Sequence, residues 1–360
     1  MKHRCQIPLF ARLRLRMLCP FLLFALSMNL HAQLDDITFR VLSNGFDING
    51  EHCIAQDSKG FMWFGSTSGL YRYDGYNFKV YRHNPSDGTS ISADAVVDIF
   101  EDASGVLWIV AGPALDKFDR KTERFTHYIH DPVDSSSPGT YGYTTMIESR
   151  DGRLWFGGDA GLEEFDRDKQ IFKHHRHDPH EFLYDDNVSI IYEDRSGILW
   201  VGTWGGGLNE FDRVTERFRS YRHKASDPKS LSDNRVHSIY ETRDGTLWIG
   251  TWGGGLNVFD RKTKSFTSFK HNPAATNSLS DDRVSSILET SDGSFWIGTF
   301  GGLNLFNRER STFVSYRYDP IRTNGLSDDK VFSLFEDRSG MFWIGTWAGI
   351  IDVNLRQNQL

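Results

Sequence analysis

Four aromatic residues stand in short, mostly glycine-rich segments and could stack on the face of a sugar ring. They are Trp204, Trp252, Phe300 and Trp347, and each follows a short apolar run that ends in Gly-Thr. Binding pockets typically combine apolar or aromatic walls with a few polar groups that orient the ligand. The alternative is that these rings fill space between repeating units. Their regular recurrence favours this simpler interpretation.

Three carboxylates interrupt the repeating pattern and are stronger candidates for a specific site. Asp116 and Glu163 stand where asparagine recurs in later repeats, and Asp159 replaces one of the segment aromatics. A pair of carboxylates could supply the acid and the base of a glycosidase or lyase. Sequence drift at a face without function would leave the same pattern. Both interpretations therefore stay open at this point.

A histidine-rich segment, with His174, His175, His177 and His180, invites a metal site. Alternate side chains of a strand point to opposite faces, so no three of these rings converge locally. His177 also falls at a position where other repeats carry histidine. We therefore expect no metal. We expect no nucleotide either, because the glycines at 205–207 join two strands and do not open a helix.

Seven tryptophans define the elements that must position these residues. Their spacings are 45, 47, 45, 48, 48 and 47 residues. Most stand in the phrase Asp/Ser-Gly-x-Leu/Phe/Met-Trp-Ile/Phe/Val-Gly. Such a period, with short alternating apolar runs and glycine turns, is typical of a β-propeller. We predict an all-β fold, a single seven-bladed β-propeller over residues 33–360, with these tryptophans wedged between adjacent sheets: Trp63, Trp108, Trp155, Trp200, Trp248, Trp296 and Trp343.

Each repeat reads as four strands. In the fifth unit we predict strands at 236–241, 247–251, 256–260 and 265–270. The turn after the second strand and the long crossover loop then open on one face, around the channel mouth. The last unit, with strands at 331–336, 342–346 and 350–354, lacks an outer strand. Residues 38–42 carry the outer-strand pattern, and we predict that they close the ring and remove its open edges.

The first 32 residues have the order of a secretory signal peptide: a cationic start, an apolar stretch and a small residue before Gln33. The apolar stretch is about 12 residues, shorter than the roughly 20 needed to span a bilayer. We predict a cleaved leader at 1–32 and a periplasmic or otherwise exported mature chain without membrane insertion. The mature chain has 36 Lys and Arg against 48 Asp and Glu. This acidic balance disfavours nucleic acid as a partner.

Longer phrases carry a family resemblance. Residues 199–213 read Leu-Trp-Val-Gly-Thr-Trp-Gly-Gly-Gly-Leu-Asn-Glu-Phe-Asp-Arg, residues 247–261 nearly repeat them, and Ser-Leu-Ser-Asp-x-Arg-Val stands at 230–236 and 278–284. The chain thus resembles the two-component regulator propeller repeat family. The resemblance implies the periplasmic sensor region of a hybrid two-component system, as in Bacteroidetes, which detects oligosaccharides released from complex glycans.

The chain departs from the family pattern in two ways. The segments at 110–113 and 157–160 replace Gly-Thr-Trp-Gly. The family's full-length receptors also resemble two propellers in tandem, followed by an immunoglobulin-like domain, a membrane helix and a histidine kinase, whereas this chain ends after one ring. We therefore expect a truncated or split sensor, a fragment, or a free-standing exported propeller, without kinase activity.

We expect an exported sensor without catalysis or cofactor that binds an oligosaccharide or another small ligand. A protein partner or a homodimer stays open. The alternatives are a polysaccharide lyase or glycosidase on the same fold, and a scaffold for protein–protein interaction. The ligand-binding residues that we predict are Trp204, Trp252, Phe300, Trp347, Asp159, Glu163 and Asp116.

Overall fold

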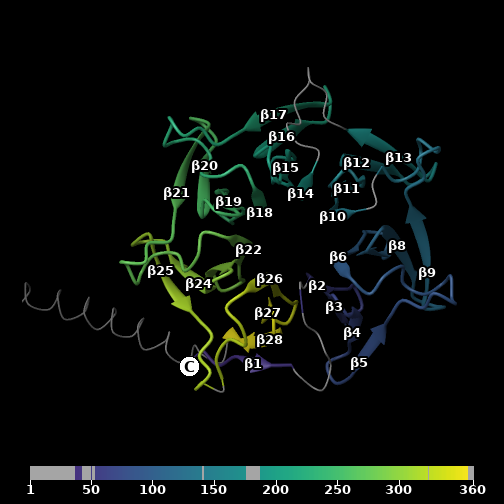
Figure 1. Ribbon diagram of the computed structural model, residues 1–360, viewed down its shortest axis with the longest axis horizontal. Coiled ribbons are helices and arrows are strands. Elements are labelled where there is room, and N and C mark those ends of the chain that lie inside the picture. Colours follow the sequence, from purple (N-terminus) through teal and green to yellow (C-terminus); the bar gives the residue numbers. More distant parts are fainter. Residues whose placement is uncertain are drawn as a thin grey trace, which may run out of the picture.

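The described strands form seven four-stranded antiparallel sheets, arranged as blades around a central axis (Figure 1). The computed structural model describes residues 37–42, 50, 53–139, 142–175, 187–322 and 324–355. The predicted seven-bladed β-propeller is therefore confirmed. The leader predicted at 1–32 lies outside the described residues, as do His177 and His180. None of the described ranges contains a helix long and apolar enough to cross a bilayer.

We number the blades 1 to 7 along the chain. Blade 1 contains β2 (Cys53–Gln56), β3 (Met62–Ser66), β4 (Gly69–Tyr73) and β5 (Phe78–Tyr81). Blade 2 contains β6 (Val96–Glu101), β7 (Leu107–Ala111), β8 (Ala114–Asp119) and β9 (Arg124–Ile129). Blade 3 contains β10 (Tyr143–Glu148), β11 (Leu154–Gly158), β12 (Gly161–Asp166) and β13 (Ile171–His175).

Blade 4 contains β14 (Val188–Glu193), β15 (Leu199–Thr203), β16 (Leu208–Asp212) and β17 (Arg217–Tyr221). Blade 5 contains β18 (Val236–Glu241), β19 (Leu247–Thr251), β20 (Leu256–Asp260) and β21 (Ser265–Phe269). Blade 6 contains β22 (Val284–Glu289), β23 (Phe295–Thr299), β24 (Gly302–Asn307) and β25 (Thr312–Tyr316). Blade 7 contains β26 (Val331–Glu336), β27 (Met341–Thr346), β28 (Gly349–Asn354) and the N-terminal β1 (Arg40–Val41).

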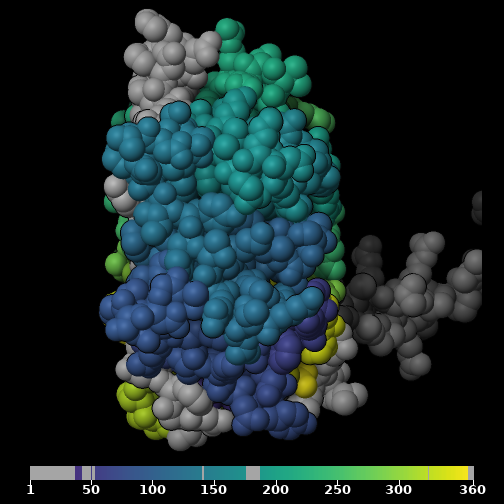
Figure 2. Space-filling view, turned by 90° about the vertical axis from the view of Figure 1, so that its right-hand side faces the viewer, coloured from purple at the N-terminus to yellow at the C-terminus, as the bar shows by residue number. Residues whose placement is uncertain are grey.

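The first strand of each blade lies nearest the axis, and the fourth forms the outer edge (Figure 1). Seen from the side, the molecule is flattened along the ring axis, and blades 1 to 4 run up the visible wall from blue to teal (Figure 2). The turn after the second strand needs glycine. In blade 5, Gly255 has a φ of +78°, and a Cβ atom there would lie 2.2 Å from the carbonyl oxygen of Phe269.

The repeated tryptophans are wedges between blades, as predicted. Trp63 and Trp200 are fully buried, and each packs edge-on against a phenylalanine of the next blade. The ring centroids of Trp200 and Phe259 are 5.4 Å apart at an interplanar angle of 73°. The Trp200 indole N–H also donates to the carboxylate of Asp194, six residues earlier, at 2.8 Å. The large apolar area that the indole ring buries and its edge-to-face contact both stabilise this packing.

A ring of backbone-to-carboxylate hydrogen bonds joins the blades at the C-terminal ends of their first strands. In blades 2 to 7 that strand ends in glutamate, which accepts from a turn of the preceding blade; Arg243 N–H, for example, donates to Glu289 at 2.7 Å. In blade 1 the acceptor is Gln56, which receives the amide of Arg338 at 2.9 Å. The contact between the last blade and the first therefore follows the same scheme as the others.

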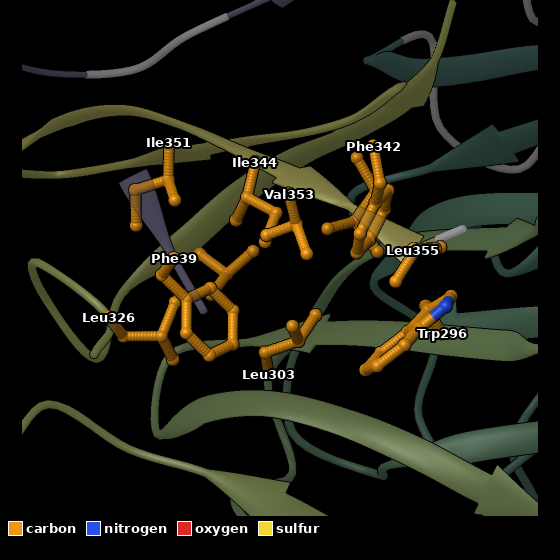
Figure 3. Packing of buried hydrophobic residues seen from close by; sticks show 11 residues of the cluster. Phe39, Trp296, Leu303, Leu326, Phe342, Ile344, Ile351, Val353 and Leu355 are labelled. Atoms are coloured by element: carbon orange, nitrogen blue, oxygen red, sulfur yellow. The ribbon is translucent and has the colours of Figure 1, made fainter. Parts of the chain in front are cut away.

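The N-terminal strand closes the ring as predicted, although β1 is shorter than the predicted 38–42. Arg40 and Val41 pair with Asp352 and Ile351 of β28, and the Arg40 side chain forms an ion pair with Asp352. Phe39 is buried in the apolar cluster between blades 6 and 7, near Leu326 and Ile351 (Figure 3). The strand thus covers the edge that β28 would otherwise expose.

Candidate ligand site at the channel mouth

One face of the ring carries both the turns after the second strands and the crossover loops. In blades 4 to 7 the turn aromatic donates its amide to the residue just before the first strand of the same blade; Trp252 N–H, for example, bonds to Arg235 O at 2.8 Å. This hydrogen bond recurs from Trp204 to Asn187, from Phe300 to Arg283 and from Trp347 to Lys330. The repeated hydrogen bond therefore holds the backbone of each turn aromatic at the same position relative to the first strand of its blade.

The four predicted aromatics lie in one continuous arc across blades 4 to 7. The ring centroids are 5.6 Å apart for Trp204 and Trp252, and 4.5 Å apart for Trp252 and Phe300. Phe332 continues the arc, at 5.1 Å from Phe300 and 6.0 Å from Trp347. Trp347 is 47% exposed, and the other three turn aromatics are partly exposed. A surface of this kind can hold the apolar face of a ligand.

Cations alternate with the rings along the arc. The Arg283 guanidinium lies 5.2 Å from the centroid of Phe300, and the Lys330 ammonium lies 4.9 Å from that of Trp347. Arg235 and Arg283 are each bound in two-point fashion by the aspartate two residues earlier, Asp233 and Asp281. These ion pairs stiffen the rim and offset most of the charge of the two guanidinium groups.

A cavity of about 210 Å³ opens between the arc and the innermost strands. This volume lies below the roughly 300–1,000 Å³ of sites for drug-sized ligands, so it suits one ring-sized group. Its lining comes from blades 2 to 5 and 7: Val97, Thr144, Ser189, Trp204, His237, Trp252 and Phe332. A cavity of about 410 Å³ lies at the outer edge of blade 6, beside Phe39 and Tyr316. The axial cavity is the better candidate because side chains of several blades converge there.

The inward-facing polar side chains bond to the next blade. Thr144 donates to Val188 O at 2.6 Å, Ser189 to Val236 O, and Ser285 to Val331 O at 2.5 Å. His237 stands at the equivalent position in blade 5, where its Nδ1 faces Ser285 O at 3.2 Å. Burial lowers the pKa of His237 below its usual value, against a weaker opposing effect of that hydrogen bond. The ring is therefore neutral at pH 7.

The structure places the three predicted carboxylates in two different settings. Asp159 is exposed in the turn of blade 3, where its amide bonds to Gly142 O at 3.3 Å, the same contact that the turn aromatics make. It thus belongs to the rim, beyond the aromatic arc. Asp116 and Glu163 are fully buried inside blades 2 and 3 and do not line the axial cavity. Their predicted contact with a ligand remains a prediction.

Asp116 and Glu163 hold crossover loops. Asp116 accepts from the amide of Ser92 at 2.8 Å and from His127 Nδ1 at 2.6 Å. Glu163 accepts from the amide of Gly139 at 2.9 Å and from His174 Nδ1 at 2.8 Å, and it also receives the hydroxyl group of Tyr143. Burial and this carboxylate raise the pKa of Tyr143. Within the described residues, no group of three potential metal ligands is gathered here or elsewhere.

In blades 4 to 6, an asparagine and a serine stand at the two positions that a carboxylate and a histidine occupy in blades 2 and 3. Asn209 accepts from Ser220 at 2.5 Å, Asn304 accepts from Ser315 at 2.8 Å, and Asn304 also takes the loop amide of Ser280 at 3.0 Å. The cross-strand partners are the same: Asp116 faces His127 as Asn304 faces Ser315. The recurring asparagines therefore bond within the fold, which agrees with the simpler interpretation.

Ser92, His127 and Asp116 do not form a nucleophilic triad. Ser92 Oγ and the carboxylate meet the same ring nitrogen, Nδ1, and Nε2 faces Gly88 O at 3.1 Å. A triad needs the base between the nucleophile and the acid, on opposite nitrogens. The recurring histidines are structural as well: His83, His223 and His271 each bond through Nδ1 to a crossover-loop carbonyl at 2.7–2.8 Å.

Sequence reasoning missed two residues of the mouth, His237 and Phe332, and one partly buried acid, Asp98. The signal was present: the second position of the first strand is Val, Thr or Ser in blades 2, 3, 4 and 6, but His237 in blade 5 and Phe332 in blade 7. Asp98, one position later in blade 2, accepts from the amides of Ile99 and Met146, both at 2.9 Å. Burial raises the pKa of Asp98 to about 7.

The comparisons with known proteins agree with this architecture. The two component regulator propeller family matches residues 185–205, 230–253, 278–301 and 325–348, which confirms the predicted resemblance. A segment of 69 residues is 39% identical to Histidine kinase P4 of Formosa agariphila and covers 19% of this chain and 5% of that protein. The chain thus spans a small part of this relative.

Two solved structures show the same fold. The extracellular domain of a protein of B. thetaiotaomicron, described as a hybrid two component system, superposes with a TM-score of 0.76 at 24% identity, over 89% of this chain and 42% of that chain. Virginiamycin B lyase from Staphylococcus aureus superposes with a TM-score of 0.65 at 15% identity, over 88% of this chain and 99% of that chain. At these identities the likeness concerns the fold alone.

Proposed function

We propose that this chain, which carries four two-component regulator propeller repeats, is the ligand-sensing part of an exported sensor and binds a glycan-derived oligosaccharide. The observation that carries the proposal is the aromatic arc beside the axial cavity, with Trp204 and Trp252 in its wall. Aromatic rings with partly exposed faces suit the C–H face of a sugar, and neighbouring polar groups can orient its hydroxyls.

The comparisons support a sensor more than an enzyme. One relative is named a histidine kinase, and one structural neighbour is the extracellular domain of a hybrid two component system. A ligand-sensing propeller of this kind would pass its signal by association with a kinase. The leader predicted at 1–32 would export it to the periplasm.

Saccharide binding is tested by titrating the purified chain with neutral and acidic oligosaccharides while following tryptophan fluorescence and heat. We expect at least one oligosaccharide to bind with one site per chain. Binding should weaken in Trp252→Ala. If none of the saccharides binds and the chain captures a defined protein partner, the result would instead support the scaffold alternative.

Catalysis is tested on the same polysaccharides. We expect no new reducing ends and no unsaturated products, because Asp116 and Glu163 are committed to buried hydrogen bonds in separate blades. Turnover that disappears in Asp159→Asn or Glu163→Gln would favour the lyase or glycosidase alternative.

A further inference from the structure

His237 differs from every described residue at its position in the other blades. The second residue of the first strand faces the axis, and in blades 2, 3, 4 and 6 it is Val97, Thr144, Ser189 or Ser285. Blade 7 has an apolar ring there, Phe332. Among the described residues of the cavity wall, His237 alone brings an ionisable ring with two nitrogen atoms.

Its neighbours hold the ring in one orientation. Trp252 stacks on it with centroids 4.9 Å apart and an interplanar angle of 27°, and Trp204 meets it edge-on at 5.6 Å and 82°. Nδ1 faces the carbonyl oxygen of Ser285, which can only accept a hydrogen bond. The proton of the neutral ring is therefore on Nδ1, and Nε2 carries a lone pair.

Nε2 is a ring acceptor of the described wall that is left for a ligand. Among the described residues no hydrogen bond engages it, whereas the hydroxyl protons of Thr144 and Ser189 are committed to the next blade. A lone pair attracts a hydroxyl or amide proton and repels the oxygen atoms of a carboxylate or sulfate. The two tryptophans beside it add partly exposed apolar surface to the wall.

We infer that His237 is the specificity-determining residue of the cavity and that its Nε2 accepts a hydrogen bond from a hydroxyl group on a neutral sugar ring lying against Trp252 and Trp204. This inference rests on the proposed function and adds the chemistry of the group that is recognised. The ligand presents a C–H face and an adjacent hydroxyl donor. An anionic substituent does not enter this position.

The test compares two probes on the protein with 15N-labelled histidine. Methyl β-glucoside has a C–H face and hydroxyl donors, and 2-methoxytetrahydropyran is the same type of ring without hydroxyl groups. Before addition, the NMR signals should show His237 protonated on Nδ1. We expect the glucoside, and not the ether, to shift the Nε2 signal of His237. A proton on Nε2, a shift caused equally by both probes, or no shift with the glucoside would overturn the inference.

Two variants form a matched pair. The amide nitrogen of His237→Asn can replace Nδ1 and donate to Ser285 O, but no atom replaces Nε2. The longer His237→Gln can place an amide oxygen near the position of Nε2. We expect Asn to weaken binding of methyl β-glucoside about 3- to 10-fold, the worth of one hydrogen bond, and Gln to retain more of the affinity. Equal affinity in the Asn variant and the wild type, with both folded, would contradict the inference.

The outcomes separate the inference from the proposed function. An oligosaccharide that binds equally well to wild type and His237→Asn leaves the sensor proposal standing and removes His237 from recognition. If no oligosaccharide binds but methyl β-glucoside shifts Nε2, the recognition chemistry stands and the biological ligand is not a glycan fragment.

Discussion

At the residue scale, two tryptophans four positions apart in blade 5 have different roles. Trp248 is buried between blades 5 and 6 and packs on Phe306 with centroids 5.4 Å apart, whereas Trp252 lines the axial cavity. Position in the strand decides the difference. Trp248 lies inside β19, and Trp252 follows it in the turn that opens on the mouth.

These positions predict separable effects. Trp248→Ala should lower the free energy of unfolding by about 3–5 kcal/mol, as expected when a core aromatic is removed. Trp252→Ala should weaken saccharide binding by about 1–3 kcal/mol if the ring is a binding anchor. Thermal melting and calorimetric titration measure the two effects. If Trp252→Ala lowers the melting temperature as much as Trp248→Ala and leaves affinity intact, the turn rings are wedges.

Asp98 predicts a pH dependence of stability. Burial raises its pKa to about 7 in the folded chain, above the usual value of 3.8. The folded state therefore binds the proton more tightly than the unfolded state. The contribution to stability is full below the unfolded pKa, falls as pH rises, and is lost above about pH 7.

The variant Asp98→Ser removes this titration. Ser286 in blade 6 already makes the equivalent contact, accepting the amide of Leu334 at 3.2 Å. We expect the variant to be more stable than wild type at pH 8 by about 1–3 kcal/mol, with a smaller gain at pH 5. Urea unfolding at both pH values measures this difference. A gain that is the same at pH 5 and pH 8 would show that Asp98 does not titrate between them.

At the scale of the element, the crossover loops of the ring are held by two chemistries. In blade 2 the loop carrying Ser92 is tied to Asp116, which His127 contacts from the outer strand. In blade 6 the loop carrying Ser280 is tied to Asn304, which Ser315 contacts in the same register. The two nitrogens of His127 face oxygen atoms of Asp116 and of the Gly88 carbonyl group.

This equivalence predicts strong coupling between Asp116 and His127. His127→Ser alone should cost about 1–3 kcal/mol, because it takes a hydrogen-bond partner from a buried carboxylate. The double change Asp116→Asn with His127→Ser installs the pair of blades 4 to 6 and should recover most of that loss. A double-mutant cycle of unfolding free energies gives the coupling. Additive single effects would argue that the pair is not linked.

At the scale of the whole molecule, closure depends on a short N-terminal segment. Phe39 and Leu42 are buried on opposite sides of blade 7, and β1 supplies its outer strand. At the end of the first strand of blade 1, the amide of Arg338 donates a hydrogen bond to the side chain of Gln56 and joins blade 7 to blade 1. The ring is therefore held shut by a strand on its rim and by a hydrogen bond near its axis.

Removal of the closing strand should open the ring. Deleting all residues up to and including Leu42 exposes the edge of β28 and the apolar surface that Phe39 and Leu42 cover. We expect a lower melting temperature and concentration-dependent association in size-exclusion chromatography, because an unpaired edge strand recruits other chains. Lys169→Ala, which removes an exposed ion pair with Asp166 in blade 3 and keeps the closing strand, is the control and should change little. A deletion variant that stays monomeric and has the melting temperature of the wild type would refute the closing role of this strand.

The amino-acid sequence by itself determined the number of blades, the positions of the predicted strands to within about one residue except for β1, and the wedge role of the tryptophans. These features depend on local patterns that recur seven times, so each repeat confirms the others. Closure was also predicted from the sequence, because residues 38–42 carry the outer-strand pattern that the last repeat lacks.

Only the tertiary structure decided what the individual polar residues do. Asp116 and Glu163 break the repeat in the sequence, but their side chains turn into the blade because a histidine on the next strand and a loop amide meet them there. His237 looked like one residue of an ordinary strand. Its free Nε2 depends on a carbonyl 48 residues away in the next blade and on two rings from separate turns. Contacts of this kind arise only when the blades pack, so no local pattern encodes them.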